Sequence, residues 1–415
     1  AGTFVVVDDT RAVLGQLAAN FYGHPSREMF LVGVTGTNGK TTTTHMIEAL
    51  LDGARVATGV IGTINNHLRT KVWPATHTTP DPLALQKLLS EWKSLKADAV
   101  AMEVSSHALA MHRADDIEFD VAVFTNLTRD HLDFHKTMEA YVEAKGRFFK
   151  VLLRNSPKKN KLALINIHDP YHKEMLAPGI TTWTYGFDEK ADLKATNIKL
   201  DFAHADFELQ SPKGSFAVRL NMTGRHNILN ALGAIGVALH RGLRPEQIQE
   251  ALGNLSGVKG RLERVATQTG IHVFVDYAHS DDALKNVLSL IKQVRDETSP
   301  KARIITVFGC GGDRDRGKRP LMRKVASHFS DVVVVTSDNP RTESPGQIIE
   351  DILAGEAPSD KLLVEADRKA AIGLAIGLAK KGDVILLAGK GHEDYQIKEK
   401  KKFPFDDAKI AADFL

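Results

Sequence analysis

Cysteine is almost absent from this chain, since Cys310 is the only one among 415 residues. One cysteine cannot form an internal disulfide, which excludes a disulfide-stabilised secreted scaffold and favours a reducing compartment. Long apolar runs are lacking too: residues 370–379 are apolar, but Lys369 and Lys380 bound them. This stretch is far shorter than the ~20 residues of a membrane-spanning helix, and we expect a buried helix there. Without signal-peptide character at its start, the sequence predicts a cytoplasmic protein that is not inserted in a membrane.

The chain also has no excess of charge of either sign. Lysine and arginine number 54 against 51 aspartates and glutamates, a net charge of +3, so nucleic acid is not an expected partner. Hydrophobic residues make up 43% and charged residues 25%, as in ordinary globular proteins. At ~150 residues per domain, the length suggests roughly two to three domains. Small-molecule substrates are expected, and an anionic one would need only a local basic cluster.

Short apolar runs rich in β-branched residues alternate with helical patterns along most of the chain. This alternation predicts an α/β fold, with a mostly parallel sheet covered by helices on both faces. Helices are expected at residues 42–51 and 226–241. Strands are expected at residues 30–34, 99–104, 121–126, 162–166, 272–276, 304–309, 332–336 and 384–388.

Three segments depart from this regular alternation. Residues 191–222 alternate with period two, which predicts a small antiparallel insertion with a turn at 211–214. A second α/β series follows, and a domain boundary is expected around residues 257–260. At the start, residues 5–7 predict a lone strand and residues 10–21 a lone helix. Because two elements cannot form a domain, we expect them to be the end of a preceding one.

The segment from Gly33 to Thr42 reads G-V-T-G-T-N-G-K-T-T and lies between an expected strand and an expected helix. Glycines let backbone N–H groups surround a phosphate, Lys40 supplies charge to the β- and γ-phosphates of ATP, and the Thr41 hydroxyl can ligate Mg²⁺. This setting disfavours a chance glycine turn and predicts a P-loop enzyme that uses ATP. The residues expected to contact the nucleotide here are Gly36, Thr37, Asn38, Gly39, Lys40, Thr41 and Thr42.

Polar residues follow two of the other expected strands. Glu103 ends one strand, where a carboxylate would ligate Mg²⁺ or position water. Taken alone it could be a surface glutamate, but the Ser-Ser-His sequence at 105–107 favours a site. Asp130, His131 and Asp133 lie close together after another strand, although a solvated loop would give the same pattern. No cysteine or His-Glu-x-x-His pattern accompanies them, so they are not a zinc signature.

Two further positions are ambiguous from the residues alone. Asn227, with Asn230 one turn later, opens an expected helix, where asparagine could bind adenine or ribose or only cap the helix. Lys145 lies in an expected helix at residues 138–149, and by itself it is predicted to face solvent. Neither pattern assigns a role.

Three strands of the second α/β series are each followed by polar or glycine-rich residues. Residues 309–319 are glycine-rich and basic, residues 338–341 read D-N-P-R, and residues 389–393 read G-K-G-H-E. Each could be a plain turn, but the carboxyl ends of strands in an open α/β sheet are where ligands bind. Arginine recognises carboxylates with paired hydrogen bonds, so a joint site for an anionic ligand is expected.

Together these motifs resemble those of the Mur ligases, the ATP-dependent amide-forming enzymes of peptidoglycan synthesis. The matching segments span almost the whole chain in the family's order: residues 33–42, 78–82, 103–107, 126–135, 141–145, 224–227, 260–263 and 276–279. In this family Asp-Asn-Pro-Arg marks members that add meso-diaminopimelate, and here it occupies residues 338–341. The resemblance therefore implies an acid–amino-acid ligase that joins meso-2,6-diaminopimelate to UDP-N-acetylmuramoyl-L-alanyl-D-glutamate.

The resemblance also implies roles for individual residues. Lys40, His131 and Lys145 would be catalytic, with Lys145 N-carbamylated so that a cation becomes an anion. The ligands of Mg²⁺ would be Thr41, Glu103, His131 and the Lys145 carbamate. Further contacts to ATP would be made by Asn227, Arg261, Asp276 and His279. The UDP-muramoyl dipeptide would be bound by Thr78, Thr79, Ser105 and Arg113. Diaminopimelate would be bound by Arg314, Asp338, Asn339, Arg341, Gly389 and Glu393.

The family's architecture implies three parts and a two-step reaction. Residues 1–27 would be the remnant of an N-terminal uridine-binding domain with its linker. Residues 28–259 would form a central ATP-binding domain, and residues 260–415 a Rossmann-like domain that binds the amino acid. The γ-phosphoryl group of ATP would move to the D-glutamyl carboxylate, and the amine of diaminopimelate would attack the acyl phosphate. We expect the protein to be a monomer.

Two other functions remain open at this point. A folylpolyglutamate synthase shares the P-loop type and the carbamylated lysine, but residues 126–135 and 338–341 favour a Mur ligase. The chain could instead be a catalytically silent nucleotide-binding protein, although every expected catalytic residue is present. Departures from residues common in the family occur at Met111, at His77 and at residues 280–282.

Overall fold

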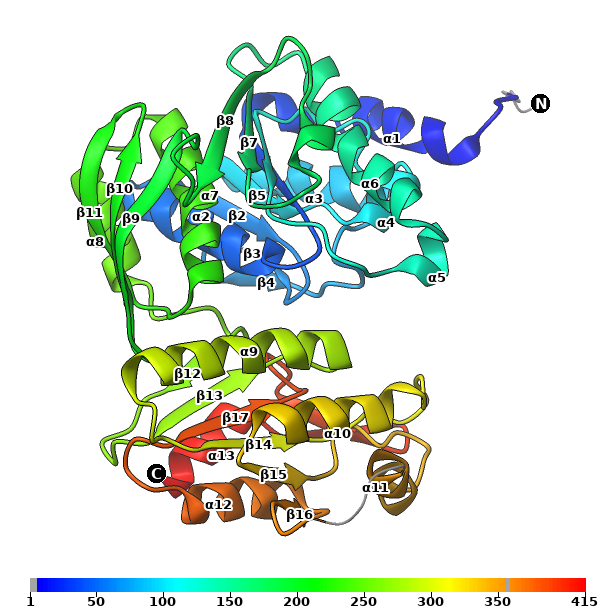
Figure 1. Cartoon of the computed structure of the whole chain (residues 1–415). Coiled ribbons are helices and arrows are strands. Elements are labelled where there is room, and N and C mark those ends of the chain that lie inside the picture. The colour runs from blue at the N-terminus through cyan, green and yellow to red at the C-terminus, as the bar shows by residue number, and fades with distance from the viewer. Residues whose placement is uncertain (1–5, 355–358) are drawn as a thin grey trace. The chain divides into compact units, whose positions relative to one another are not determined.

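The computed structural model describes residues 6–354 and 359–415 and divides into two compact units (Figure 1). The first unit comprises the described chain up to Ser256, except for two short segments, and the second unit begins at Gly257. The two segments, Leu200–His204 and Met222–Gly224, belong to the second unit. The change of unit thus lies beside the boundary region that the sequence predicts.

The first unit is built on an 11-stranded sheet. Its strands are β1 (Phe30–Thr35), β2 (Thr58–Ile61), β3 (Asn66–Leu68), β4 (Lys71–Trp73), β5 (Ala99–Glu103), β6 (Val121–Phe124), β7 (Leu162–Asn166), β8 (Thr181–Gly186), β9 (Leu193–Leu200), β10 (Ala205–Ser211) and β11 (Gly214–Leu220). Their order is β11-β10-β9-β8-β7-β6-β1-β5-β2-β3-β4. The pairs from β2 through β5, β1, β6 and β7 to β8 are all parallel, which confirms the predicted α/β class.

Helices cover both faces of this sheet (Figure 1). The helices of this unit are α1 (Thr10–Phe21), η1 (Pro25–Glu28), α2 (Lys40–Gly53), α3 (Pro82–Ser94), α4 (Ser106–Ala110), α5 (Leu132–His135), α6 (Met138–Arg147), η2 (Phe148–Leu153), η3 (His172–Met175), α7 (Arg225–Arg241) and α8 (Pro245–Asn254). The paired helices α2 and α7 pack on the central strands, α2 on β2 and β5 and α7 on β7 and β8. Strands buried on both faces explain the uninterrupted apolar runs, such as the four buried residues of β6.

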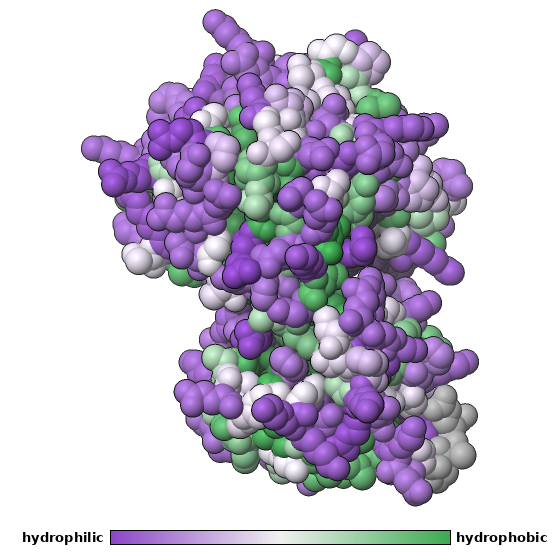
Figure 2. Space-filling model, turned by 60° about the vertical axis from the view of Figure 1, so that its left-hand side comes forward, coloured by the Kyte–Doolittle hydropathy of each residue, from purple (hydrophilic) through white to green (hydrophobic). Residues whose placement is uncertain are grey.

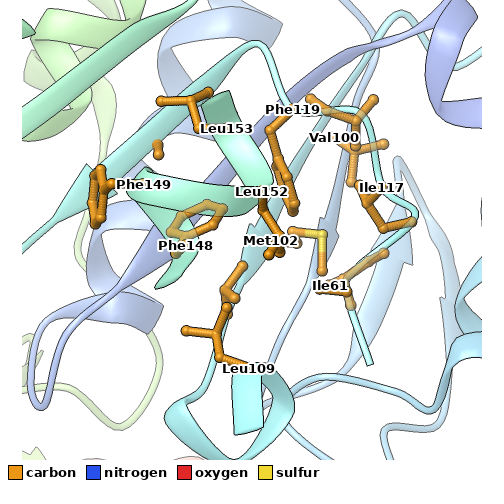
Figure 3. Close-up of a cluster of buried hydrophobic side chains, with 14 of the residues drawn as sticks. Ile61, Val100, Met102, Leu109, Ile117, Phe119, Phe148, Phe149, Leu152 and Leu153 are labelled. Atoms are coloured by element: carbon orange, nitrogen blue, oxygen red, sulfur yellow. The ribbon is translucent and has the colours of Figure 1, made fainter. Parts of the chain in front are cut away.

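An apolar cluster on the face bearing α3, α4 and η2 anchors this unit (Figure 3). Phe148 and Phe149 of η2 are fully buried, and the Phe148 ring stands edge-on to Phe119 with 4.9 Å between centroids. Each fully buried side chain of this size contributes about 1.5–3 kcal/mol to folding. Gly33 of β1 is needed beneath them, because a side chain there would collide with Phe148. The cluster fixes β1, and therefore the position of the loop that follows it.

The predicted antiparallel segment is present, but it continues the main sheet. β10 and β11 pair along their whole length, and the turn falls between Ser211 and Gly214 as expected. Gly214 has φ +112°, a conformation that side chains rarely adopt. β9 joins the segment to the sheet through a short parallel pairing with β8, from Tyr185↔Leu193 to Gly186↔Lys194.

The second unit has a 6-stranded sheet in the order β12-β13-β17-β14-β15-β16 and a separate hairpin, β18-β19. The strands are β12 (Glu263–Val265), β13 (His272–Asp276), β14 (Ile304–Phe308), β15 (Val332–Val335), β16 (Leu362–Val364), β17 (Val384–Ala388), β18 (Tyr395–Lys398) and β19 (Lys401–Pro404). The helices are α9 (Asp281–Thr298), α10 (Lys318–Phe329), α11 (Pro345–Leu353), α12 (Arg368–Leu378) and α13 (Asp407–Phe414). One apolar cluster includes residues of α9, α10 and α11, and another includes residues of α12 and α13. The four predicted strands correspond to β13, β14, β15 and β17.

The start of the chain differs from the prediction. The helix expected at residues 10–21 is α1, and it packs against α3 within the first unit. The strand expected at residues 5–7 is wrong for Val6 and Val7, which have no strand pairing, and Val6 is 95% exposed. Val5 lies outside the described residues.

The helices of the described residues can be compared with the length and apolar character that a membrane-spanning helix needs. None of their helices is both long enough and apolar enough to cross a membrane. The apolar stretch at residues 370–379 lies in α12, which buries Ala371, Ile372 and Ala375 against the second sheet. On the face drawn in Figure 2, hydrophilic residues predominate and hydrophobic ones form small areas between them.

Candidate active site

The phosphate loop connects β1 to α2, as the sequence predicts. Gly36 has φ +153° and Gly39 has φ +86°, and a side chain on either would collide with a neighbour, Thr125 or Asn230. The segment after β6 fixes the loop: the N–H of Thr37 donates to the carbonyl of Asn126 at 2.8 Å, and that of Asn38 to its Oδ1 at 2.9 Å. The glycines are therefore required by close packing as well as by the conformation of the loop.

The loop offers the features that a polyphosphate needs. α2 begins at Lys40 with Gly39 as its N-cap, and no side chain caps its first turn. Backbone N–H groups at such a helix start attract anions. The Lys40 ammonium lies over the loop and donates to the carbonyls of Gly36 and Thr37, both at 2.9 Å. The side chain is thus held beside the helix start, where the predicted phosphates would bind.

Glu103 is buried beside the loop and is not a surface residue. Only 1% of it is exposed, because β5 lies next to β1 and Glu103 is in register with Val34. Its Oε1 accepts hydrogen bonds from Thr41 Oγ1 and from the backbone N–H of Thr63, both at 2.9 Å. A hydroxyl and a carboxylate placed together are ligands that Mg²⁺ prefers, so this pair fits the predicted metal ligation. Nothing in the sequence marks Thr63 as part of the site, and it was not predicted to belong to it.

The four residues expected to bind the UDP-muramoyl dipeptide lie together around the end of β5. Thr79 Oγ1 donates to the carbonyl of Glu103 at 2.8 Å and accepts from the N–H of Ser105 at 3.1 Å. The Arg113 guanidinium donates to the carbonyl of Thr79 at 3.1 Å, and its other end contacts the sulfur of Met111 at 3.4 Å. Thr78 lies 3.1 Å from the Thr63 hydroxyl. Thr79 and Arg113, which are 34 positions apart in sequence, are therefore in direct contact.

Lys145 is buried, so the expectation of a solvent-facing lysine is wrong. It is 1% exposed, and its ammonium donates to the carbonyl of Gly36 at 2.8 Å and lies 4.8 Å from the centre of the Tyr141 ring. Among the described residues no acidic side chain forms an ion pair with it. Burial, followed by the nearby charge of Lys40, holds the pKa of Lys145 well below its usual value. The helical spacing of Tyr141, Val142 and Lys145, which form one buried face, was the signal available in the sequence.

Three histidines lie close to one another, and two of them contact Tyr141, the residue whose ring lies beside Lys145. His131 adopts φ +54°, and the centre of its ring is 4.8 Å from that of His107, which in turn is 5.6 Å from that of His135. Burial lowers the pKa of His131, and Lys40 and Lys145 act in the same direction. Burial, followed by the charge of His107, lowers the pKa of His135 to about 4. Neutral rings keep a lone pair for a metal ion, which fits the predicted role of His131.

The two asparagines of α7 are buried, with exposures of 2% for Asn227 and 6% for Asn230. The Asn230 amide donates to Asn227 Oδ1 at 3.3 Å, and Asn230 packs against Gly39 of the phosphate loop. α2 and α7 pack together along their length. Asn227 is therefore linked to the phosphate loop through Asn230, which is compatible with the predicted contact to nucleotide.

In the second unit, the residues expected to contact ATP lie at the end of β13. The half-buried Asp276 accepts with its carboxylate from the backbone N–H groups of Leu262 at 2.7 Å and Ala278 at 2.9 Å. The Arg261 guanidinium lies 5.2 Å from the centre of the Tyr277 ring, and His279 Nδ1 is 2.8 Å from the carbonyl of Tyr277. Asp276 thus orders the two segments that carry Arg261 and His279.

The residues expected to bind diaminopimelate lie after β14, β15 and β17. Asn339 donates from its amide to Glu393 Oε2 at 2.8 Å and accepts the N–H of Ile397 at 2.8 Å. The fully buried Lys390, which was not assigned a role, donates to Asn339 Oδ1 at 3.1 Å and lies 3.4 Å from Asp338. The shared sheet edge that the sequence predicts is therefore present.

Two arginines flank the glycine-rich segment of this edge. Arg341 adopts φ +51° and donates to the carbonyl of Gly312 at 2.7 Å, while its backbone N–H donates to Ile397 in the hairpin. Arg314 is exposed and, like Arg341, lies beside Gly311. Arginine side chains at a strand end suit a ligand that carries carboxylates.

Comparison with known proteins identifies the class to which this fold and site belong. Residues 34–238 match the Mur ligase middle domain, and residues 260–391 match the Mur ligase glutamate ligase domain. The chain belongs to the Mur ligase family. It is 43% identical over 416 aligned residues to the UDP-N-acetylmuramoyl-L-alanyl-D-glutamate–2,6-diaminopimelate ligase of Syntrophomonas wolfei. The alignment covers 100% of this chain and 83% of that protein.

Solved structures support the same assignment. The structure of a UDP-N-acetylmuramoyl-L-alanyl-D-glutamate–2,6-diaminopimelate ligase superposes with a TM-score of 0.72 at 35% identity, covering 99% of this chain and 85% of that one. Folylpolyglutamate synthase of Mycobacterium tuberculosis, complexed with ADP and AMPPCP, has a TM-score of 0.71 at 18% identity, with 91% and 92% of the two chains covered. The second likeness shows a shared fold only, so the relatives of higher identity carry the comparison.

Proposed function

We propose that this chain is the ligase that joins meso-2,6-diaminopimelate to UDP-N-acetylmuramoyl-L-alanyl-D-glutamate, with hydrolysis of ATP. The observation that carries the proposal is the grouping of Thr41, Glu103 and the buried Lys145 around one phosphate loop. The names of the relatives at 43% and 35% identity support the same activity. The reaction must activate a carboxylate, since a carboxylate resists attack by an amine.

Activation of the D-glutamyl carboxylate uses the phosphate loop. Backbone N–H groups at the start of α2 and the Lys40 ammonium would hold the β- and γ-phosphates of ATP. Thr41 and Glu103 would hold Mg²⁺, which supplies positive charge to the phosphoryl group in transfer. Thr78, Thr79, Ser105 and Arg113 would place the acceptor carboxylate beside them, as their position around Glu103 suggests. The γ-phosphoryl group then passes to that carboxylate, and ADP leaves.

Lys145 would take part as a carbamate. Its amine is buried beside Lys40 without a carboxylate partner among the described residues, which favours the neutral form. A neutral amine can bond to carbon dioxide and release a proton, and the resulting carbamate is an anion with oxygen ligands. Together with His131, such a group would hold a second Mg²⁺ near the loop. The conversion also removes the repulsion between two neighbouring ammonium groups.

Amide formation requires the amino acid to be bound and oriented by the second unit. Arg314 and Arg341 would pair with carboxylates of diaminopimelate, and Asp338, Asn339 and Glu393 would accept from its ammonium groups. Arg261, Asp276 and His279 would contact the nucleotide, with Asn227 from the first unit. The free amine of diaminopimelate then attacks the acyl phosphate, and phosphate leaves. We further propose that residues 28–259 act as the ATP-binding domain and residues 260–415 as the amino-acid-binding domain.

The test is phosphate release from ATP with the complete UDP-muramoyl dipeptide and either meso-diaminopimelate or L-lysine. We expect release only when dipeptide and amino acid are both present, with a kcat/KM for diaminopimelate far above that for L-lysine. Equal or better turnover of L-lysine would remove the assigned specificity. Turnover with a folate and glutamate in place of both substrates would favour a folylpolyglutamate synthase activity instead. Absence of any turnover would favour a silent nucleotide-binding protein.

A further inference from the structure

Two histidines and a glutamate converge beside the phosphate loop without a role in the proposed reaction. His45 and Glu48 are three residues apart on α2, so they lie on one face of that helix. His67 lies in β3, which is between β2 and β4 in the sheet. One potential ligand atom from each of the three side chains lies within 4.8 Å of the other two. All three residues are partly buried, which limits the freedom of their side chains.

The outer hydrogen bonds of both imidazoles fix which ring nitrogen faces the cluster. His45 Nδ1 is 2.8 Å from the carbonyl of Thr41, and a carbonyl only accepts, so Nδ1 carries the hydrogen. His67 Nδ1 likewise lies 2.7 Å from Oδ1 of Asn65. Both Nε2 atoms are therefore left for the cluster. Histidines that ligate metals usually donate their other N–H to a carbonyl or carboxylate in this manner.

We propose that His45, Glu48 and His67 bind a divalent transition-metal ion, for which Zn²⁺ is the best match. Two imidazole nitrogens and one carboxylate oxygen form a three-ligand set with a fourth position left for water. Imidazole ligands favour transition metals, whereas Mg²⁺ prefers oxygen ligands. The site is therefore chemically distinct from the predicted Mg²⁺ ligands Thr41 and Glu103.

Metal binding requires a small rearrangement with a definite proton balance. His67 Nε2 lies 2.7 Å from Glu48 Oε1, so without a metal a proton occupies this contact. An ion with metal–ligand bonds of about 2.0–2.2 Å keeps its tetrahedral ligand atoms about 3.4 Å apart. Glu48 and His67 would therefore separate slightly, and the shared proton would be released to solvent. Binding should accordingly weaken as the pH falls.

The location of the cluster links it to the phosphate loop. His45 is bonded to the carbonyl of Thr41, whose hydroxyl donates to Glu103. The connection from β2 to β3 carries Thr63, whose N–H donates to the same carboxylate. A bound ion would thus link α2 to β3. It would help to hold in place Thr41 and Thr63, the two residues that donate to Glu103. Because the ion binds only the folded cluster, it should raise the melting temperature of the protein.

The experiment measures Zn²⁺ binding to the whole chain by equilibrium dialysis with metal analysis, in excess Mg²⁺ that competes at the predicted active-site ligands. Wild type is compared with Glu48→Gln, which keeps an acceptor for His67, and with His67→Gln, which keeps a donor to Glu48. We expect wild type to bind one more equivalent of Zn²⁺ than either variant. Any Zn²⁺ that still binds at this site in the variants should do so with at least about tenfold weaker affinity. Wild type alone should gain melting temperature from Zn²⁺.

A double variant, His240→Ala with His328→Ala, controls for non-specific binding to histidines elsewhere and should retain the additional equivalent. Melting temperatures measured without metal establish that the glutamine variants fold. Equal Zn²⁺ stoichiometry and affinity in wild type and both glutamine variants would overturn the proposal, as would the absence of binding to wild type. Because binding and melting are measured without substrate, these outcomes do not depend on the proposed ligase activity.

Discussion

The ammonium groups of Lys40 and Lys145 donate to the same oxygen, the carbonyl of Gly36, at 2.9 Å and 2.8 Å. One lysine comes from the phosphate loop and the other from α6, 105 positions apart in numbering but adjacent in space. Two like charges at one acceptor repel each other, and Lys145 is the more deeply buried of the two. The pair explains why Lys145 is suited to conversion into an anion.

Replacement of Lys145 by alanine should abolish ligase activity, by more than about 100-fold in kcat, since it removes a charged group beside the transferring phosphoryl group. Steady-state phosphate release is the measurement, and added bicarbonate should not restore activity because the amine is gone. Wild type should gain the mass of one carbon dioxide when analysed under native conditions with bicarbonate. Retained activity in the alanine variant would remove the carbamate proposal.

Lys145 should also make the stability of the protein depend on pH. Its folded pKa lies below its usual value, so the unfolded chain binds more protons between the folded pKa and about 10.4, and stability rises with pH in that window. The slope approaches about 1.4 kcal/mol per pH unit where the lysine is charged only in the unfolded chain. Lys145→Met should lack this slope. Denaturant unfolding of both proteins in buffer free of carbon dioxide tests this, and parallel curves would contradict it.

Gly36→Ala should destabilise the first unit by about 1–3 kcal/mol, because its φ of +153° is unfavourable for alanine and the added methyl group would collide with Thr125. Distortion of the loop should also weaken ATP binding, measured by calorimetry. Gly253→Ala is the matched control, since it lies in α8 with open space around it. It should be neutral or stabilise by up to about 1 kcal/mol. Similar losses in both variants would show that loop geometry is not the cause.

Lys390→Met should raise the KM for diaminopimelate more than the KM for ATP. The variant leaves Asp338 and Glu393 without the buried ammonium group that lies 3.4 Å from each, and Asn339 loses a donor at 3.1 Å. Stability should fall as well, since removal of one partner of a buried charge cluster is destabilising. The exposed Lys400→Met serves as a control that should change neither constant. Equal increases in both KM values would argue against a specific effect on the amino-acid site.

Local patterns predicted the regular elements of this fold because their cause is local. Strand β1, the phosphate loop and α2 follow from one apolar run, a set of glycines and a helical pattern, and all three are present. The predicted shared sheet edge in the second unit is also present, because strand direction alone determines it. By contrast, Val6 has no strand pairing although it lies in an apolar run. Pairing requires a neighbouring strand, which a short run cannot reveal.

Contacts between distant segments limited the prediction of the candidate site. The burial of Lys145 depends on the packing of α6 beside the phosphate loop. Its helical spacing with Tyr141 and Val142 indicates a buried face, but not which segment covers that face. Thr63 reaches Glu103 only because β2 lies next to β5 in the sheet. His67 likewise approaches α2 only through the order of the strands. The roles assigned to individual residues therefore remain predictions, even where the structure brings those residues together.

The central claim is that this site activates a carboxylate by phosphorylation before an amide forms. The most direct measurement uses the UDP-muramoyl dipeptide labelled with heavy oxygen in the D-glutamyl side-chain carboxylate, with ATP and meso-diaminopimelate. We predict that each phosphate released carries one labelled oxygen, because the carboxylate oxygen that accepts the phosphoryl group leaves with it. Phosphate without label would show that ATP is hydrolysed by water, and would contradict the assignment of this site to a ligase.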